Sequence, residues 1–238
     1  MTNVTDLLLY MREVGVADIE SLKSVFPNVN VLLTRLVNSG RIARLKRGHY
    51  TSIPFDPFKV AKFVSSGYVS FYSALYYYNA VDEVPATITI ATRGISRKRV
   101  VFDTEFQEVS IGRRFRGYVD GEVRVATRAK AVFDSFKRPD LGGGFSRLLK
   151  ALFEMKLKKN EWKEFIDYFN RFERPSSFQK MGYLLSLSNP PKWVIQTFER
   201  KAGASKVFLW GRSPGKLIKN WNVIDNIGRG VLLSWMKG

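Results

Sequence analysis

The sequence contains no cysteine and only one histidine, His49, among its 238 residues. Without cysteine the chain can form no disulfide, no thiolate zinc site and no thiol nucleophile. One histidine cannot build a metal site from a histidine pair, and it leaves a single candidate for histidine-dependent catalysis. We therefore predict that the protein is not an enzyme and has no catalytic residue, no metal and no cofactor.

Long apolar runs are also missing, since no stretch approaches the ~18 apolar residues of a membrane-spanning helix. The N-terminus does not have the pattern of a signal peptide, because Asp6 and Glu13 flank its short apolar run and no small-residue cleavage site follows. The sequence therefore predicts a cytoplasmic protein that makes no contact with a membrane.

Acidic side chains are scarce beside basic ones. The chain has 21 Asp and Glu against 39 Lys and Arg, which gives a formal net charge of +18. Such an excess attracts polyanions, and nucleic acid is the leading partner. Hydrophobic residues make up 45% of the chain, enough for globular cores. We expect two domains, residues 1–53 and residues 54–238.

Helical periodicity predicts three short helices at the start of the chain, over residues 4–14, 18–26 and 30–39. Either Thr2 or Asn3 can cap the first of them. Proline follows the second helix directly and glycine follows the third, and both residues are typical of helix ends.

The third of these helices, residues 30–39, has two distinct faces. Its apolar face consists of Val29, Leu32, Leu33, Leu36 and Val37. The opposite face consists of Asn30, Val31, Thr34, Arg35 and Asn38. Polar side chains suit base edges and phosphates, and an isolated valine suits a thymine methyl group. An ordinary solvated face is the alternative interpretation.

A basic β-hairpin is expected next, over residues 41–51, with its turn at Gly48. Its candidate DNA-contacting side chains are Arg41, Arg44, Lys46, Arg47 and His49. Three helices followed by a cationic hairpin are typical of the winged helix-turn-helix, whose second motif helix enters the major groove of duplex DNA. A winged helix used only for protein contacts is the alternative, and it would not need a cationic hairpin.

The remainder of the chain predicts a larger α/β domain with a small mixed sheet, so that the fold class is α+β. Helices are expected at 58–64, 68–79, 127–136, 145–153, 162–172, 176–187 and 193–200. Strands are expected at 87–91, 100–102, 106–111 and 123–126, and two last strands at 206–210 and 220–224 are expected to return to the same sheet. We expect the aromatic side chains of 68–79 to pack in the core rather than stack on bases.

Three segments carry weak enzyme-like patterns. The sequence GRSPGK at 211–216 lacks the spacing and the hydroxyl residue of a P-loop, so we interpret it as a turn. Asp120 and Glu122 faintly resemble a nuclease metal site, but Gly121 between them indicates a hairpin tip. Gly142 to Gly144, with Ser146, resemble the glycine-serine opening of nucleotidyltransferases, but no paired aspartates follow at short spacing to hold a metal. We therefore interpret these glycines as a break between two helices.

Positive charge continues into the second domain, where Arg93, Arg97, Lys98 and Arg99 form the densest run. Such a surface suits DNA, RNA or an acidic protein, and a solvated surface is equally consistent with it. The alternative function is therefore an RNA-binding or RNA-processing protein that uses the basic second domain. A further alternative is an adaptor for a protein partner.

Three segments together resemble the AbiEi-type antitoxins of type IV toxin-antitoxin systems. The first is GYVSFYSALYYYNAVDEVPATITIAT, directly after the expected winged helix. The second is VRVATRAKAVFDSFKRPDLGGG, in which Ala126-Thr127, Lys130-Ala131, Asp134 and Gly142-Gly143 follow the family's order and spacing. The third is SSFQKMGYLLSL. The resemblance spans nearly the whole chain.

The resemblance implies a transcriptional regulator that binds inverted repeats in its own promoter. It would repress an operon shared with a nucleotidyltransferase-like toxin and counteract that toxin, directly or indirectly. The positions that match the family's DNA contacts are the third helix and the hairpin, and the antitoxin role would belong to residues 54–238. Palindromic operators would favour two protomers on DNA.

Overall fold

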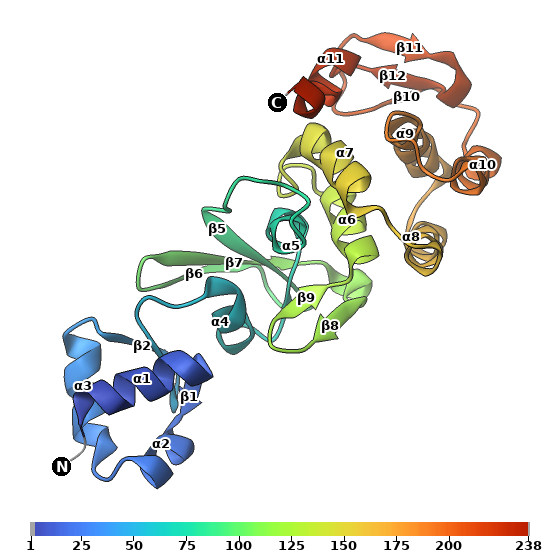
Figure 1. Cartoon of the computed structure of the whole chain (residues 1–238). Helices are drawn as coiled ribbons and strands as arrows, with labels where there is room; N and C mark the ends of the chain where they lie inside the picture. The colour runs from blue at the N-terminus through green and yellow to red at the C-terminus, as the bar shows by residue number, and fades with distance from the viewer. Residues whose placement is uncertain (1–2, 238) are drawn as a thin grey trace. The chain divides into compact units, whose positions relative to one another are not determined.

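The structure, a computed structural model, describes residues 3–237 of the chain (Figure 1). The chain forms two compact units. One contains the chain up to Val69 together with Ala86–Val125, and the other contains Ser70–Pro85 together with the chain from Ala126 onward. Helices and small sheets are mixed along the chain, which confirms the α+β class. The domain boundary after residue 53 stays a prediction, because the division into these two units does not show whether residues 1–53 fold on their own.

The first unit opens with the three expected helices: α1 (Val4–Val14), α2 (Ile19–Val25) and α3 (Val29–Asn38). Asn3 caps α1 by accepting a hydrogen bond of 2.9 Å from the backbone N–H of Thr5, whereas Thr2 lies outside the described residues. Asp18 caps α2 in the same way. The predicted ends agree with the structure to within one or two residues, because proline, glycine and capping residues stand at them.

A three-stranded antiparallel sheet follows these helices, in the order β1-β3-β2: β1 (Val16–Asp18), β2 (Ile42–Lys46) and β3 (His49–Ser52). Strands β2 and β3 are the predicted hairpin, and Gly48 takes the positive φ of 75° that its turn requires. The backbone N–H of Ile19 donates to the Gly48 carbonyl at 2.7 Å. The hairpin tip is thus fixed to the start of α2.

After α4 (Pro57–Val64), the first unit contains a six-stranded sheet in the order β6-β7-β5-β4-β9-β8. Its strands are β4 (Tyr68–Val69), β5 (Thr87–Thr92), β6 (Arg97–Val101), β7 (Thr104–Ser110), β8 (Tyr118–Asp120) and β9 (Arg124–Ala126). Parallel and antiparallel pairs both occur, which confirms the mixed sheet. Strand β6 begins at Arg97, earlier than expected, because an edge strand tolerates exposed basic side chains.

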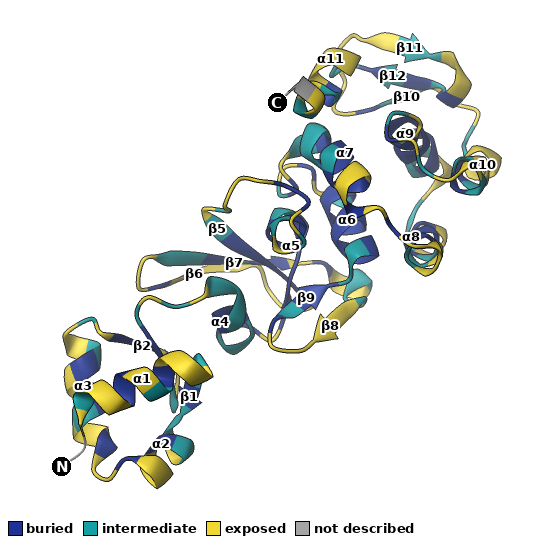
Figure 2. Cartoon of the chain, viewed as in Figure 1, coloured by how far each residue is buried: buried dark blue, intermediate teal, exposed yellow. Residues whose placement is uncertain are grey.

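The second unit is mainly helical: α5 (Phe71–Tyr77), α6 (Arg128–Lys137), α7 (Gly144–Met155), α8 (Lys159–Phe172), α9 (Pro175–Ser186), α10 (Lys192–Lys201) and α11 (Arg229–Leu232). The expected helix at 68–79 is shorter than predicted, because its first residues form β4. Helix α5 has both buried and partly exposed positions (Figure 2). Phe71 and Leu75 are fully buried, whereas Tyr72, Tyr76 and Tyr78 are half-buried. The core prediction for these aromatic residues therefore holds in part.

The last strands form a sheet of their own, which corrects the expectation that they return to the larger sheet. Strands β10 (Val207–Phe208), β11 (Lys216–Ile218) and β12 (Val223–Asp225) pair in the order β10-β12-β11. The unpredicted strand β11 pairs with β12, and β10 occupies the other edge of β12, so both edges of β12 are used. Across residues 3–237, no helix has both the length and the apolar character needed to cross a bilayer.

Candidate nucleic-acid interface

Helix α3 presents the predicted polar face to solvent. Val29, Leu33 and Leu36 are buried in the core formed with α1 and α2. The exposed residues are Asn30, Val31, Thr34, Arg35 and Asn38. Val31 is 61% exposed and is the one apolar residue of this face. The assignment of the two faces from the periodicity is therefore confirmed.

The start of α3 favours an anion. Asn28 precedes the helix in the left-handed region, with φ 59°, and its side chain makes no capping hydrogen bond. The first turn of α3 contains no acidic residue. The positive end of the helix dipole and the first backbone N–H groups consequently stay uncompensated by side chains.

A hollow of about 620 Å³ lies beside this end of α3. Val31 and Arg35 of α3 line it together with Val25, Asn28 and Asp6. The hollow brings two of the predicted site residues together with a carboxylate. The carboxylate of Asp6 reduces the positive potential on the side of this hollow that faces α1.

The β2–β3 hairpin carries the second group of predicted residues. Arg44 and Lys46 alternate with buried Leu45 on β2, and Arg47 lies at the turn. His49 is half-buried, with Nδ1 3.2 Å from the Arg47 carbonyl oxygen. The Lys46 ammonium lies 5.6 Å from the centroid of the Phe63 ring.

The arginines of the hairpin are available to a polyanion. Within the part of the chain that the structure describes, Arg41, Arg44 and Arg47 form no ion pair with an acidic side chain. All three are exposed. Exposed and uncompensated guanidinium groups are the usual contacts to backbone phosphates.

Three of the four residues in the densest basic run of the sequence already form hydrogen bonds with neighbouring groups. Arg97 donates to both carboxylate oxygens of Glu108, at 2.7 and 3.2 Å, and these bonds raise the pKa of the arginine. Lys98 donates to Glu105 at 3.1 Å, which lowers the pKa of that carboxyl group. Arg99 donates to the backbone carbonyl of Leu45 in the hairpin. Arg93, the remaining member of the run, forms no ion pair with any carboxylate of the described residues.

A second basic surface was missed by the sequence analysis. A cavity of about 910 Å³ in the first unit is lined by Arg93, Arg116, Phe115 and Tyr118, among other residues. Three of these belong to the segment RRFRGY at 113–118, in which arginines and aromatic residues are interleaved. That interleaving, which is typical of nucleic-acid-binding surfaces, is the signal that could have found it.

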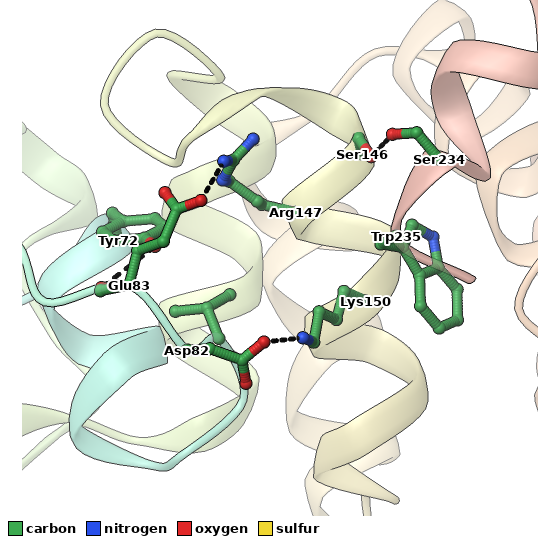
Figure 3. Close-up of a pocket in the computed structure, with 9 residues that line it drawn as sticks. Tyr72, Asp82, Glu83, Ser146, Arg147, Lys150, Ser234 and Trp235 are labelled. Carbon is green, nitrogen blue, oxygen red and sulfur yellow. Dashed lines mark hydrogen bonds and ion pairs between the residues drawn. The ribbon is translucent and has the colours of Figure 1, made fainter. Parts of the chain in front are cut away.

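A smaller cavity of about 240 Å³ lies in the second unit, and its polar groups bond mainly to one another (Figure 3). Arg147 donates to Glu83 at 2.7 Å, and Lys150 pairs with Asp82. The hydroxyl of Ser146 lies 2.9 Å from that of Ser234. Because its cations already face carboxylates, this cavity offers little to an anionic ligand.

The two carboxylates that faintly suggested a metal site are held by cations instead. Asp120 accepts a hydrogen bond of 2.7 Å from Arg124, which lowers the pKa of Asp120, and Glu122 pairs with Lys59. Gly121 lies in the turn between β8 and β9, as predicted. Among residues 3–237, no group of three or more histidine or acidic side chains is placed to hold a metal ion.

Comparisons with known proteins show a similar fold and no shared family. No protein-family profile matches the chain, and no curated protein matches it. The chain is similar in structure to the crystal structure of the RV2827C protein from Mycobacterium tuberculosis, with a TM-score of 0.63 and 15% sequence identity. The match covers 94% of this chain and 90% of that one. At this identity, the likeness establishes a shared fold and nothing about activity.

Proposed function

We propose that this protein is a DNA-binding transcriptional regulator, in which α1–α3 and β1–β3 act as a winged helix-turn-helix. Helix α3 enters the major groove of duplex DNA, and the β2–β3 hairpin is the wing that contacts backbone phosphates. The observation that carries the proposal is the exposed polar face of α3, followed directly by a hairpin whose arginines are uncompensated.

The exposed residues of α3 suit base recognition. Arg35 can donate two hydrogen bonds to guanine, and Asn30 or Asn38 can form two hydrogen bonds with adenine. Val31, 61% exposed, suits the methyl group of thymine. The wing residues Arg41, Arg44, Lys46, Arg47 and His49 supply contacts that do not depend on sequence.

The resemblance to the AbiEi-type antitoxins extends this proposal. The protein would repress its own operon at inverted repeats, as two protomers on a palindromic site. Residues 54–238 would counteract a nucleotidyltransferase-like toxin, directly or indirectly. Co-expression with the product of an adjacent nucleotidyltransferase-like gene tests this role, because an antitoxin restores growth and a stand-alone repressor does not.

Salt dependence tests the wing. In the variant Arg44→Ala/Lys46→Ala/Arg47→Ala, affinity for the duplex upstream of its own gene should fall, and the slope of log affinity against log salt should flatten by about 0.9 for each phosphate that is no longer neutralised. The matched control is Lys159→Ala/Lys163→Ala/Lys219→Ala, which removes the same charge from exposed positions of the second unit. Equal slopes in the two variants would refute the wing assignment.

Sequence preference tests α3. Arg35→Ala and Asn30→Ala should each reduce discrimination between operator and mutated duplexes by about 1–3 kcal/mol, if the replaced side chain bonds a base edge. Arg12→Ala, on the exposed side of α1, should leave that discrimination unchanged. A uniform loss of affinity for all duplexes would instead assign Arg35 and Asn30 to the DNA backbone.

A further inference from the structure

The cavity lined by Arg93, Arg116, Phe115 and Tyr118 in the first unit, here called the Tyr118 cavity, combines aromatic rings with guanidinium groups. Its volume of about 910 Å³ is within the ~300–1,000 Å³ of sites that enclose ligands. The turn between β5 and β6 forms one wall, and the segment from Phe115 to Tyr118 forms another.

The ring of Tyr118 is a preformed platform. One of its faces stacks on the ring of Tyr68, with centroids 4.9 Å apart and planes inclined by 18°. Tyr68 is itself buried, and its hydroxyl donates to the carbonyl of Arg116 at 3.1 Å, so both the ring and the segment that carries it are held. Tyr118 is nevertheless 40% exposed. The ring of Phe115 also packs against Tyr118 at a tilt, with centroids 5.6 Å apart, and the part of the Tyr118 ring that stays exposed lines the cavity, where a planar group can stack.

The charge of the cavity favours an anion. Three arginines line it, Arg93, Arg97 and Arg116, against a single carboxylate, Glu108. Arg97 compensates that carboxylate through its two hydrogen bonds. The guanidinium of Arg93 lies 5.8 Å from the centroid of Phe115 and pairs with no described carboxylate. A net positive charge therefore remains beside the aromatic rings.

We propose that the Tyr118 cavity binds single-stranded nucleic acid, with one base stacked on Tyr118 and a neighbouring phosphate at Arg93. Aromatic stacking next to arginines is the usual recognition of single strands without sequence preference. A base in a duplex is already stacked on both sides, so its face cannot lie on a tyrosine ring unless the strand opens. The residues that line this cavity differ from those of the duplex interface proposed for α3 and the wing.

The probe is a dye-labelled single strand of about 12 nucleotides and mixed sequence, prepared both as RNA and as DNA. Fluorescence anisotropy with the full chain should show that Tyr118→Leu weakens binding about 5- to 150-fold, the range expected for one stacked base. Tyr118→Phe keeps the ring, and it should bind within about twofold of the natural protein. Tighter binding of the RNA or the DNA probe would show that the site recognises that sugar. Equal binding would show that it recognises only the base and the phosphate.

Charge gives a second, independent readout. Arg93→Ala should lower the salt slope for the single strand by about 0.7, the value for one neutralised phosphate. Lys163→Ala, an exposed position of the second unit, should leave the slope unchanged. These two variants have the same net charge, so a difference between them locates the phosphate.

Two comparisons separate this site from the wing. Tyr118→Leu should keep duplex binding, and an unchanged far-UV circular dichroism spectrum shows that the variant is folded whether or not the protein binds duplex. The triple wing variant Arg44→Ala/Lys46→Ala/Arg47→Ala should keep single-strand binding. The proposal is overturned if Tyr118→Leu binds the single strands as the natural protein does. It is equally overturned if an unlabelled duplex displaces them as well as an unlabelled single strand, since the cavity would then be part of a duplex footprint.

Discussion

Lys130 and Asp134 lie one turn apart on α6 and form an ion pair in which both side chains are fully buried. The second oxygen of Asp134 accepts a hydrogen bond of 2.8 Å from the Ser70 hydroxyl. The ammonium of Lys130 lies 5.4 Å from the centroid of Phe133 and 5.6 Å from that of Tyr168. Neither charge is stable alone in such surroundings, so each is retained because the other is present.

Removing one member of this pair should therefore destabilise the protein strongly. Lys130→Met leaves the Asp134 carboxylate buried without its cation, and we expect the free energy of unfolding to fall by about 3–5 kcal/mol. Unfolding in urea, followed by circular dichroism, measures the change.

A surface pair with the same spacing provides the control. Arg171 and Asp167 form an ion pair of 2.6 Å on α8, and both side chains are about half exposed. Asp167→Asn should cost only about 0.3–0.5 kcal/mol, because solvent screens the pair. Similar losses from Lys130→Met and Asp167→Asn would contradict the role assigned to burial.

Gly182 and Trp221 approach each other so closely that no larger residue fits at the glycine. A Cβ atom at Gly182 would lie 2.0 Å from the Trp221 ring, which is itself buried. Gly→Ala within a helix normally stabilises it by about 0.5–1 kcal/mol, whereas overpacking a core costs about 1–3 kcal/mol. We expect overpacking to dominate in Gly182→Ala, with a lower urea midpoint and an altered tryptophan emission spectrum.

Gly230 is the matched control for Gly182, because it is also helical but has open space around it. Gly230→Ala should leave the stability unchanged or raise it slightly. Stabilisation by Gly182→Ala of the same size would show that the Trp221 ring can move aside without cost.

Local patterns predicted much of the fold. The faces of α3 follow from the helical period, since Val29, Leu33 and Leu36 recur on one side and are buried. Helix ends were predictable where capping residues such as Asp18 stand. Strands β1 and β11, of three residues each, were missed because such short strands show no clear period.

The candidate surfaces were predictable only where they are local. The residues of α3 and the β2–β3 hairpin are neighbours in sequence, so their pattern is visible. The partner of Arg97 is Glu108 on the adjacent strand, and strand pairing is not encoded in any short pattern. The Tyr118 cavity likewise joins two segments about twenty residues apart, which only the sheet brings together.

The raised pKa of Tyr78 predicts that the protein loses stability at high pH. Its hydroxyl donates to the carbonyl of Ala126 at 2.7 Å, and burial raises the pKa of Tyr78 from 10.0 to about 12. A raised pKa stabilises the folded state fully below the unfolded value of 10.0, and this contribution disappears as pH rises through about 12. Urea unfolding between these two pH values should therefore show stability falling with pH.

The variant Tyr78→Phe isolates this contribution. It removes the hydrogen bond, at a cost of about 1 kcal/mol near neutral pH, and it removes part of the alkaline loss of stability. Tyr118→Phe, at an exposed ring that does not contribute to the pKa of Tyr78, should keep the full alkaline loss. An unchanged pH profile in Tyr78→Phe would mean that other groups cause the alkaline unfolding.

Because of Asp18, the stability of α2 depends on pH in acidic solution. The Ser21 hydroxyl donates to the Asp18 carboxylate at 2.6 Å, and the backbone N–H groups of Ser21 and Glu20 donate at 2.9 and 3.0 Å. These hydrogen bonds, with that of the Ser21 hydroxyl the largest, lower the pKa of Asp18 below its ordinary 3.8. The cap therefore contributes fully above pH 3.8 and is lost as pH falls through the lowered value.

Two substitutions separate the cap from its charge. Asp18→Ala removes every acceptor and should cost about 0.5–2 kcal/mol at neutral pH, whereas Asp18→Asn keeps a capping oxygen and should cost a smaller amount. The difference between the natural protein and Asp18→Ala should shrink as the solution is acidified, because protonated Asp18 is a poorer acceptor. Equal losses of stability in the two variants at neutral pH, with no dependence on acid, would contradict the role of the Asp18 side chain as the cap of α2.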